Sequence, residues 1–148
     1  MPLYSSAQNI RSYFVALNEI MQRYRALQRG RLAEQRFQLA RMKAAEAGPK
    51  RKEILKEIYS AQSIENLELI DMSSALGGLR PPAVFSAPHQ RLLQALDEMV
   101  AANQDKATAR SSNDKQALSK AHQREKHAID LWRAAANELK KLGQDLHT

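Results

Sequence analysis

The chain of 148 residues contains no cysteine, which excludes disulfides, thiolate metal sites and thiol nucleophiles. Aromatic residues make up only 5%, and glycine and proline number five each. β-Branched residues are also few, so a β-sheet would lack its usual material. The residues that dominate instead are straight-chain types and alanine, which lose little rotamer freedom in a helix. The composition therefore predicts an all-α protein.

Long hydrophobic runs are missing as well. No apolar stretch approaches the roughly 18 residues that are needed to span a bilayer. The first 14 residues, MPLYSSAQNIRSYF, have no basic region followed by an apolar run, so they do not resemble a signal peptide. We expect no transmembrane segment and a cytoplasmic location.

Motifs for catalysis are lacking too. The sequence has neither a Gly-x-Ser-x-Gly element nor a glycine-rich phosphate loop, since Gly77-Gly78 follows a helical pattern and not a strand. Nothing in the sequence places a base beside a nucleophile. We therefore expect a protein that is not an enzyme and that uses no cofactor, no metal and no small-molecule substrate.

Apolar residues that recur every three to four positions predict four helices. We expect them at about residues 6–46, 50–73, 87–107 and 113–142, with a crossover loop at 74–86 that holds the Gly77-Gly78 and Pro81-Pro82 pairs. The apolar side of the second helix is expected to consist of Ile54, Leu55, Ile58, Ala61, Ile64, Leu67 and Ile70. Whether the first helix continues through Gly30 is open at this point, because glycine costs about 1 kcal/mol in a helix interior.

Four amphipathic helices with short first and third connections favour an antiparallel bundle. A chain of this length is one ordinary domain. The fold that we expect is a single all-α domain, an antiparallel four-helix bundle made of two helical hairpins. Its first helix is over-long, so part of that helix would project as an arm.

Positive charge is concentrated in residues 23–52. This stretch has ten basic and two acidic residues, a net charge of +8, whereas the whole chain carries +7. The remainder of the chain thus sums to −1. A charge that is confined to one segment calls for an explanation in that segment.

On a helix, four of these basic residues share one face. At 100° per residue, Arg25, Arg29, Arg36 and Lys43 lie within about 40° of one another and form a stripe about 27 Å long. With Arg41 they are the candidate residues for binding a partner or an anion. The alternative is a solvated helix face that keeps the protein soluble.

We expect a helical interaction or structural protein that binds a protein partner, or a second copy of itself, through this basic arm. The alternative function is sequence-independent nucleic-acid binding by the same residues. No helix-turn-helix, zinc-finger or basic-zipper pattern is present, so such binding would depend on backbone charge.

Two further features lie on the apolar line of the last helix. His122 and Glu125, three residues apart, could share a metal or a proton, but one helix supplies too few ligands, so a structural or solvent-facing pair is the expectation. Trp132 is the only tryptophan. On such a line it is expected to be a core anchor, with partner contact as the alternative.

Overall fold

The structure is a computed structural model that describes residues 3–44 and 49–145. Side-chain surroundings are described within these ranges except at residues 3–8, 32–36, 39, 43–44, 49–52, 55 and 58–62.

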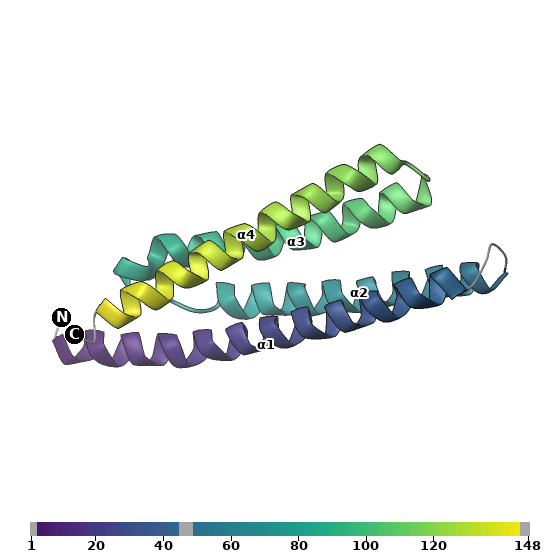
Figure 1. Cartoon of the computed structure of the whole chain (residues 1–148). Helices are drawn as coiled ribbons and strands as arrows, with labels where there is room; N and C mark the ends of the chain where they lie inside the picture. Colours follow the sequence, from purple (N-terminus) through teal and green to yellow (C-terminus); the bar gives the residue numbers. More distant parts are fainter. Residues whose placement is uncertain (1–2, 45–48, 146–148) are drawn as a thin grey trace.

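Four long helices and one short helical turn make up the described chain, which contains no β-strand (Figure 1). They are α1 (Leu3–Ala44), α2 (Pro49–Gly77), the 3-10 helix η1 (Ala83–Phe85), α3 (Ser86–Ser111) and α4 (Lys115–Asp145). The all-α prediction is therefore confirmed. With 42 residues α1 is the longest helix, and it runs without interruption through Gly30.

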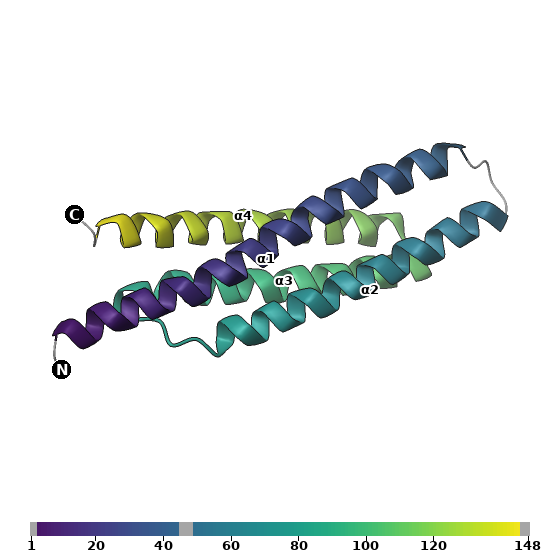
Figure 2. The same ribbon diagram turned by 90° about the horizontal axis from the view of Figure 1, so that it is seen from below.

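The helices form two pairs. α1 lies beside α2, and α3 lies beside α4, in both views of the ribbon (Figures 1 and 2). The α1–α2 pair extends past the α3–α4 pair at the end where the two helices of the first pair are joined. α1 begins and α4 ends at the opposite end of the molecule (Figures 1 and 2). The second half of α1 consequently has fewer neighbours than the first half.

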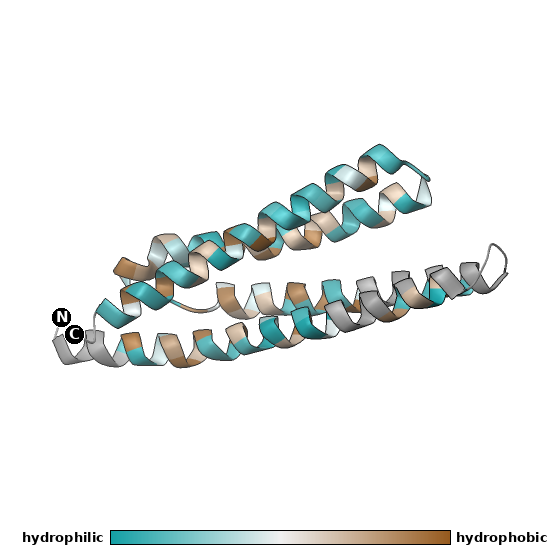
Figure 3. Cartoon of the chain, in the orientation of Figure 1, coloured by the Kyte–Doolittle hydropathy of each residue, from teal (hydrophilic) through white to brown (hydrophobic). Residues whose placement is uncertain are grey.

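Apolar side chains from all four helices meet between the pairs, and apolar and polar segments alternate along each helix (Figure 3). The buried core consists of Tyr13, Leu17, Ile20, Tyr24, Leu69, Met72, Leu76, Phe85, Leu92, Ala95, Leu96, Met99, Ala128, Trp132, Ala135 and Leu139. At the end of the molecule where α1 begins, Tyr13 stacks on Phe85 of η1 with ring centroids 5.7 Å apart. α4 also comes close to α1 here, because a Cβ at Gly143 would be only 2.9 Å from Phe14.

Three helices extend beyond their expected C-terminal ends, and α4 does so by the smallest margin, to Asp145 instead of residue 142. α2 continues to Gly77 instead of stopping at residue 73, and α3 continues to Ser111 instead of residue 107. The polar composition after Ala107 does not end the helix. Backbone hydrogen bonds close the turn that follows it, from the N–H of Ser112 to the carbonyl of Thr108 at 3.0 Å and from the N–H of Asp114 to the carbonyl of Ala109 at 2.9 Å. Asn113 adopts a left-handed conformation with φ 54°, which asparagine tolerates. Asp114 then caps α4 by accepting a hydrogen bond from the backbone N–H of Ala117 at 3.0 Å.

The core-facing side of α2 differs from the expected one. Among its expected apolar residues, Ile54 is buried, but Ile64, Leu67 and Ile70 are exposed, and the side chains of Leu55, Ile58 and Ala61 lie outside the described residues. Leu69, Met72 and Leu76 enter the core instead. α2 has apolar residues on two faces, so its periodicity fits two orientations. Packing against α1 and α3 selects one face and leaves the other uncovered.

Candidate interaction site on the first helix

Arg25 and Arg29 are the expected site residues that remain available for a partner. Both are exposed on α1 and lie one helical turn apart. Neither forms an ion pair or hydrogen bond with any part of the chain that the structure describes. Their two positive charges are therefore uncompensated by any side chain that the structure describes.

Other arginines of the basic stretch are paired with α2. Arg41, an expected site residue, forms an ion pair with Glu57 and lies over the ring of Phe37, 5.7 Å from its centroid. Arg23 pairs with Asp71 at 2.7 Å and with Glu68 at 3.3 Å. These contacts fasten α1 to α2, so Arg41 is only partly available to another molecule. The side chains of two further expected residues, Arg36 and Lys43, lie outside the described residues.

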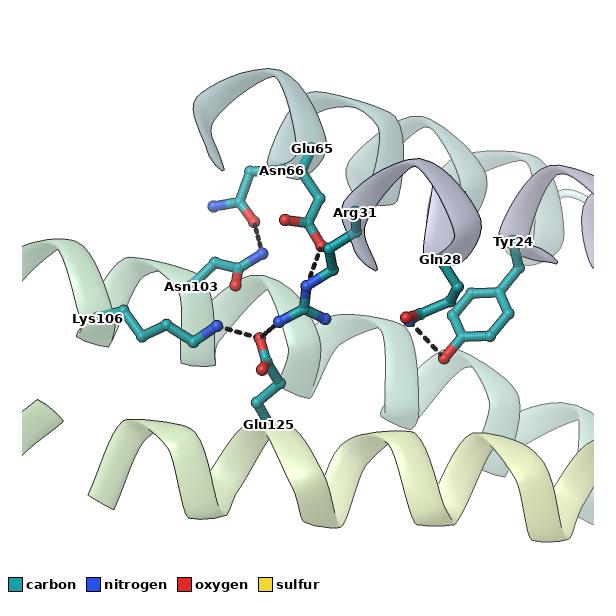
Figure 4. A network of polar contacts seen from close by, with 8 residues as sticks. All are labelled: Tyr24, Gln28, Arg31, Glu65, Asn66, Asn103, Lys106 and Glu125. Carbon is teal, nitrogen blue, oxygen red and sulfur yellow. Dashed lines mark hydrogen bonds and ion pairs between the residues drawn. The ribbon is translucent and has the colours of Figure 1, made fainter. Parts of the chain in front are cut away.

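A cluster of four charged side chains lies between the two helix pairs, and each helix contributes one member (Figure 4). Arg31 of α1 pairs with Glu125 of α4, which also pairs with Lys106 of α3. The guanidinium of Arg31 also lies 3.5 Å from Glu65 of α2. All four side chains are largely buried, and two positive charges balance two negative ones. We call these four residues the ion cluster.

An amide pair extends the ion cluster on one side. The side-chain amide of Asn103 donates a hydrogen bond to the Oδ1 of Asn66 at 2.9 Å, which joins α3 to α2 (Figure 4). On the other side Gln28 donates to the hydroxyl of Tyr24 at 2.9 Å. The polar layer therefore spans the interior, and a slip of any one helix would leave buried charges unpaired.

Burial and pairing act in opposite directions on the ion cluster. Burial raises the pKa of Glu65 and lowers that of Lys106. Burial also opposes ionisation of Glu125, but the charges of Lys106 and Arg31 overcome it, so the pKa of Glu125 lies below its usual range. Burial lowers the pKa of Arg31, but the charges of its two carboxylate neighbours raise it by more, so the pKa of Arg31 is raised overall. Glu125 is thus the anion that both cations require.

Three members of the ion cluster were not expected from the sequence, although a signal for them was present. Arg31 follows the buried Tyr24 by seven residues, and Lys106 follows Met99 by seven, so both continue core lines of their helices. Glu65 likewise precedes Leu69 by four residues. Interruption of an apolar line by a charge at the same height on four helices is the pattern that identifies such a cluster.

His122 and Glu125 do not form the pair that their spacing suggested. His122 is exposed, whereas Glu125 turns into the interior and bonds to Lys106 and Arg31. Across residues 3–44 and 49–145, side chains whose surroundings are described form no group of three or more potential metal ligands.

His89 is buried and bridges α1 to the end of α2. Its Nε2–H donates to the carbonyl oxygen of Leu76 at 3.0 Å, so its Nδ1 accepts a hydrogen bond from the Tyr13 hydroxyl at 2.8 Å. Burial lowers the pKa of His89 from its ordinary value of 6.5 and raises that of Tyr13. The neutral imidazole is the form that fits this position.

Stability is expected to fall as the pH decreases below about 6.5, because unfolded His89 then binds a proton that the folded form resists. This contribution is fully present above pH 6.5 and is lost as the pH falls through the lower pKa of the folded state, with a slope of at most about 1.4 kcal/mol per pH unit.

His89→Gln offers an acceptor and a donor but does not titrate. Urea denaturation of both proteins between pH 5 and 8 should show a shallower slope for His89→Gln. Equal slopes would contradict the assignment. His122, whose pKa is also lowered, is common to both proteins and cancels.

A pocket of about 580 Å³ lies between the start of α1 and the connection after α2. Its lining consists of Asn9, Ser12, Tyr13, Gly78, Leu79, Arg80, Pro81, Pro82 and Ala83. These side chains include one cation and no carboxylate or imidazole, so the pocket places no base beside its hydroxyl groups. We assign no chemistry to it. None of the helices, over the residues described, is both long and apolar enough to cross a membrane.

Comparison with known proteins gives no assignment: no protein-family model, no curated protein and no solved structure is significantly similar to the chain.

Proposed function

We propose that this protein is a non-enzymatic helical interaction protein that binds a protein partner through the second half of α1. Its architecture in this proposal is a single domain, an antiparallel four-helix bundle whose over-long first helix serves as the arm. The ion cluster holds the four helices in register, so that the arm keeps one orientation. The partner meets a rigid surface, which reduces the entropy that binding would cost.

One observation supports this proposal above the others: Arg25 and Arg29 are exposed and have no ion partner among the described side chains, while Arg23, Arg31 and Arg41 are paired within the chain. Unpaired charges on a rigid helix steer an oppositely charged partner and fix its orientation.

Reversing the two free charges is expected to abolish partner binding without affecting the fold. Arg25→Glu/Arg29→Glu removes attraction at two exposed positions, so helix content and melting temperature should stay nearly constant. The measurement is affinity capture from extracts of the native host, in parallel with and without nuclease. Lys120→Glu/Lys141→Glu is the matched control, because it changes the net charge equally at exposed, unpaired positions of α4. Undiminished capture by the arginine variant would refute the arm hypothesis.

Sequence-independent nucleic-acid binding is the second candidate, because the same two arginines could contact phosphates. In that case captured material would disappear on nuclease treatment. The affinity for duplex DNA or RNA would also fall linearly with salt concentration on a log–log plot. If this protein is not retained on heparin at low salt, nucleic-acid binding is eliminated as a function.

A further inference from the structure

α1 and α4 are in direct contact, and two contacts fix how the helices are aligned. Tyr24 packs on Trp132 with ring centroids 4.3 Å apart, and Arg31 pairs with Glu125. Seven residues separate these contacts on each helix, so the antiparallel helices keep one register. In Figure 2 the middle of α1 overlaps α4, whereas α2 and α3 lie toward the other side of the molecule. Both α1 and α4 therefore have a flank that is directed away from α2 and α3.

The flank of α1 that is directed away from α2 carries Arg25 and Arg29. Arg23, which bonds to acids of α2, lies about 100° from the buried Tyr24 in one direction round the helix. Arg25 lies about 100° and Arg29 about 140° from Tyr24 in the other direction. Phe14, about 80° round in that same direction, comes close to the end of α4. The two arginines are therefore on the flank that borders α4.

The flank of α4 that is directed away from α3 carries three further cations. Arg124 and Glu138 form ion pairs with α3 and lie about 80° and 120° from the buried Trp132 in one direction. In the other direction, at about 80° to 120°, are Lys140, Arg133 and Lys126. Because α2 and α3 pack on each other, the free flanks of α1 and α4 lie on the same side of the molecule.

These exposed cations form one surface, which we call the basic flank and define by Arg25, Arg29, Lys126, Arg133 and Lys140. The register places the two cations of α1 between the heights of Lys126 and Arg133. Among the described side chains only Asp130 pairs with a member, Arg133, at 4.0 Å, and both are more than half exposed. Such a pair contributes little. The structure describes every side chain of α1 from residue 9 to 31 and of α4, so this excess of positive charge is observed directly.

The surface between the two rows of cations is partly apolar. Met21 of α1 and Ile129 of α4 each lie about 60° from the buried aromatic residue of their helix, in the direction of the basic flank. Both pack against the core and remain partly exposed. Apolar residues with charges on both sides are the arrangement along the contact line of packed helices.

The cations of α4 recur at the period of helix packing. Lys126, Arg133 and Lys140 are seven residues apart, which is about two helical turns or 10.5 Å. Charges at this interval beside an apolar line select a partner helix that has opposite charges at the same interval. A second copy of this chain, which carries +7, would bring the same cations to the contact. The surface therefore fits an acidic helix from a different chain.

We propose that the basic flank binds an acidic helix of a partner protein, which lies lengthwise between α1 and α4. The apolar residues of that helix cover Met21 and Ile129, and its carboxylates, repeated every seven residues, pair with the cations of the basic flank. This inference rests on the proposed function. It names the class of partner and extends the contact from α1 to α4.

A labelled synthetic peptide of about 21 residues, long enough to be helical, tests the proposal by fluorescence anisotropy. It carries leucine along one face and, on both sides of that face, glutamate at every seventh position. A second peptide replaces each glutamate by lysine, and a third has the glutamates moved to the opposite face. The full chain should bind the first peptide at least tenfold more tightly than either of the others, and added salt should weaken binding. Equal binding of the first and third peptides would overturn the inference.

Two double variants separate the two rows of the basic flank. Arg133→Gln/Lys140→Gln removes two charges from α4, and it should weaken binding of the first peptide about tenfold or more. Arg25→Gln/Arg29→Gln removes two charges from α1 and should have an effect of the same size. If only the α1 variant loses binding, this inference fails while the proposed function survives. If neither variant loses binding, this inference also fails, and the capture experiment with Arg25→Glu/Arg29→Glu decides the proposed function separately.

Lys120→Gln/Lys141→Gln is the matched control for these variants. It also removes two charges from exposed positions of α4, but both lie outside the basic flank. Binding of the first peptide should change less than about twofold in this control. Circular dichroism should show unchanged folding in all three variants, because every substituted side chain is exposed. A loss in the control as large as in the other variants would overturn the inference.

Two other occupants would also overturn the inference. A dimer in sedimentation velocity that Arg133→Gln/Lys140→Gln converts to a monomer would show that a second copy covers the basic flank. Duplex DNA that binds more tightly than the first peptide, displaces it, and loses affinity in the same two variants would assign the basic flank to nucleic acid.

Discussion

Replacing Glu125 by glutamine is expected to lower the free energy of unfolding by about 3–5 kcal/mol. Glutamine has nearly the same size, so the packing is retained while the charge is removed. Arg31 and Lys106 would then remain buried with only Glu65 to balance them. An uncompensated charge in the interior costs far more than an exposed ion pair contributes.

Urea denaturation followed by far-ultraviolet circular dichroism measures this loss. Glu138→Gln is the control, because Glu138 forms an ion pair with Arg91 in which both side chains are about 40% exposed, and its loss should cost less than about 1 kcal/mol. Equal losses of unfolding free energy in the two variants would show that the ion cluster stabilises the fold no more than an exposed ion pair does. Replacing all four members of the ion cluster by leucine and methionine should be nearly neutral, because no unpaired charge remains.

Replacing Trp132 by alanine is expected to cost about 3–5 kcal/mol, the usual range for removing a large aromatic side chain from a core. Trp132 is only 4% exposed, and its ring packs on Tyr24 with centroids 4.3 Å apart. This contact is one of the few that join α1 directly to α4, so a cavity there would also loosen the two helix pairs from each other.

Chemical denaturation followed by circular dichroism measures this effect, because the alanine variant lacks the fluorescent reporter. Trp132→Phe keeps an aromatic ring and should lose considerably less stability. In the unmodified protein the tryptophan emission should shift to longer wavelength on unfolding. A Trp132→Ala protein that is as stable as the parent but fails to bind its partner would instead make Trp132 a contact residue.

The class of fold followed from local patterns. Straight-chain residues, apolar spacing of three to four and breaks at Gly77-Gly78 and Pro81-Pro82 predicted helices that the structure contains. The ends were less accurate, since α2 and α3 extend past their expected ends. Local sequence gives each turn only a small preference, whereas a helix end is decided by whether its last carbonyls find partners.

The candidate site was only partly accessible from the sequence. Spacing grouped the basic residues on one helix face, but it could not tell which of them have partners in the folded chain. Arg41 pairs with Glu57, sixteen residues away, and Arg31 pairs with Glu125 on the last helix. Only Arg25 and Arg29 are shown to remain unpaired among the expected residues whose side chains are described.

By itself, the sequence determined that this chain is helical, that its positive charge is concentrated in one segment, and that thiol chemistry is excluded. These properties depend on residue type and on spacing within one helix. The tertiary structure decided which face of α2 enters the core, which arginines are neutralised, and that Arg31, Glu65, Lys106 and Glu125 meet in the interior. The physical reason is that burial and ion pairing are contacts between distant segments, and a helical period fits more than one such arrangement.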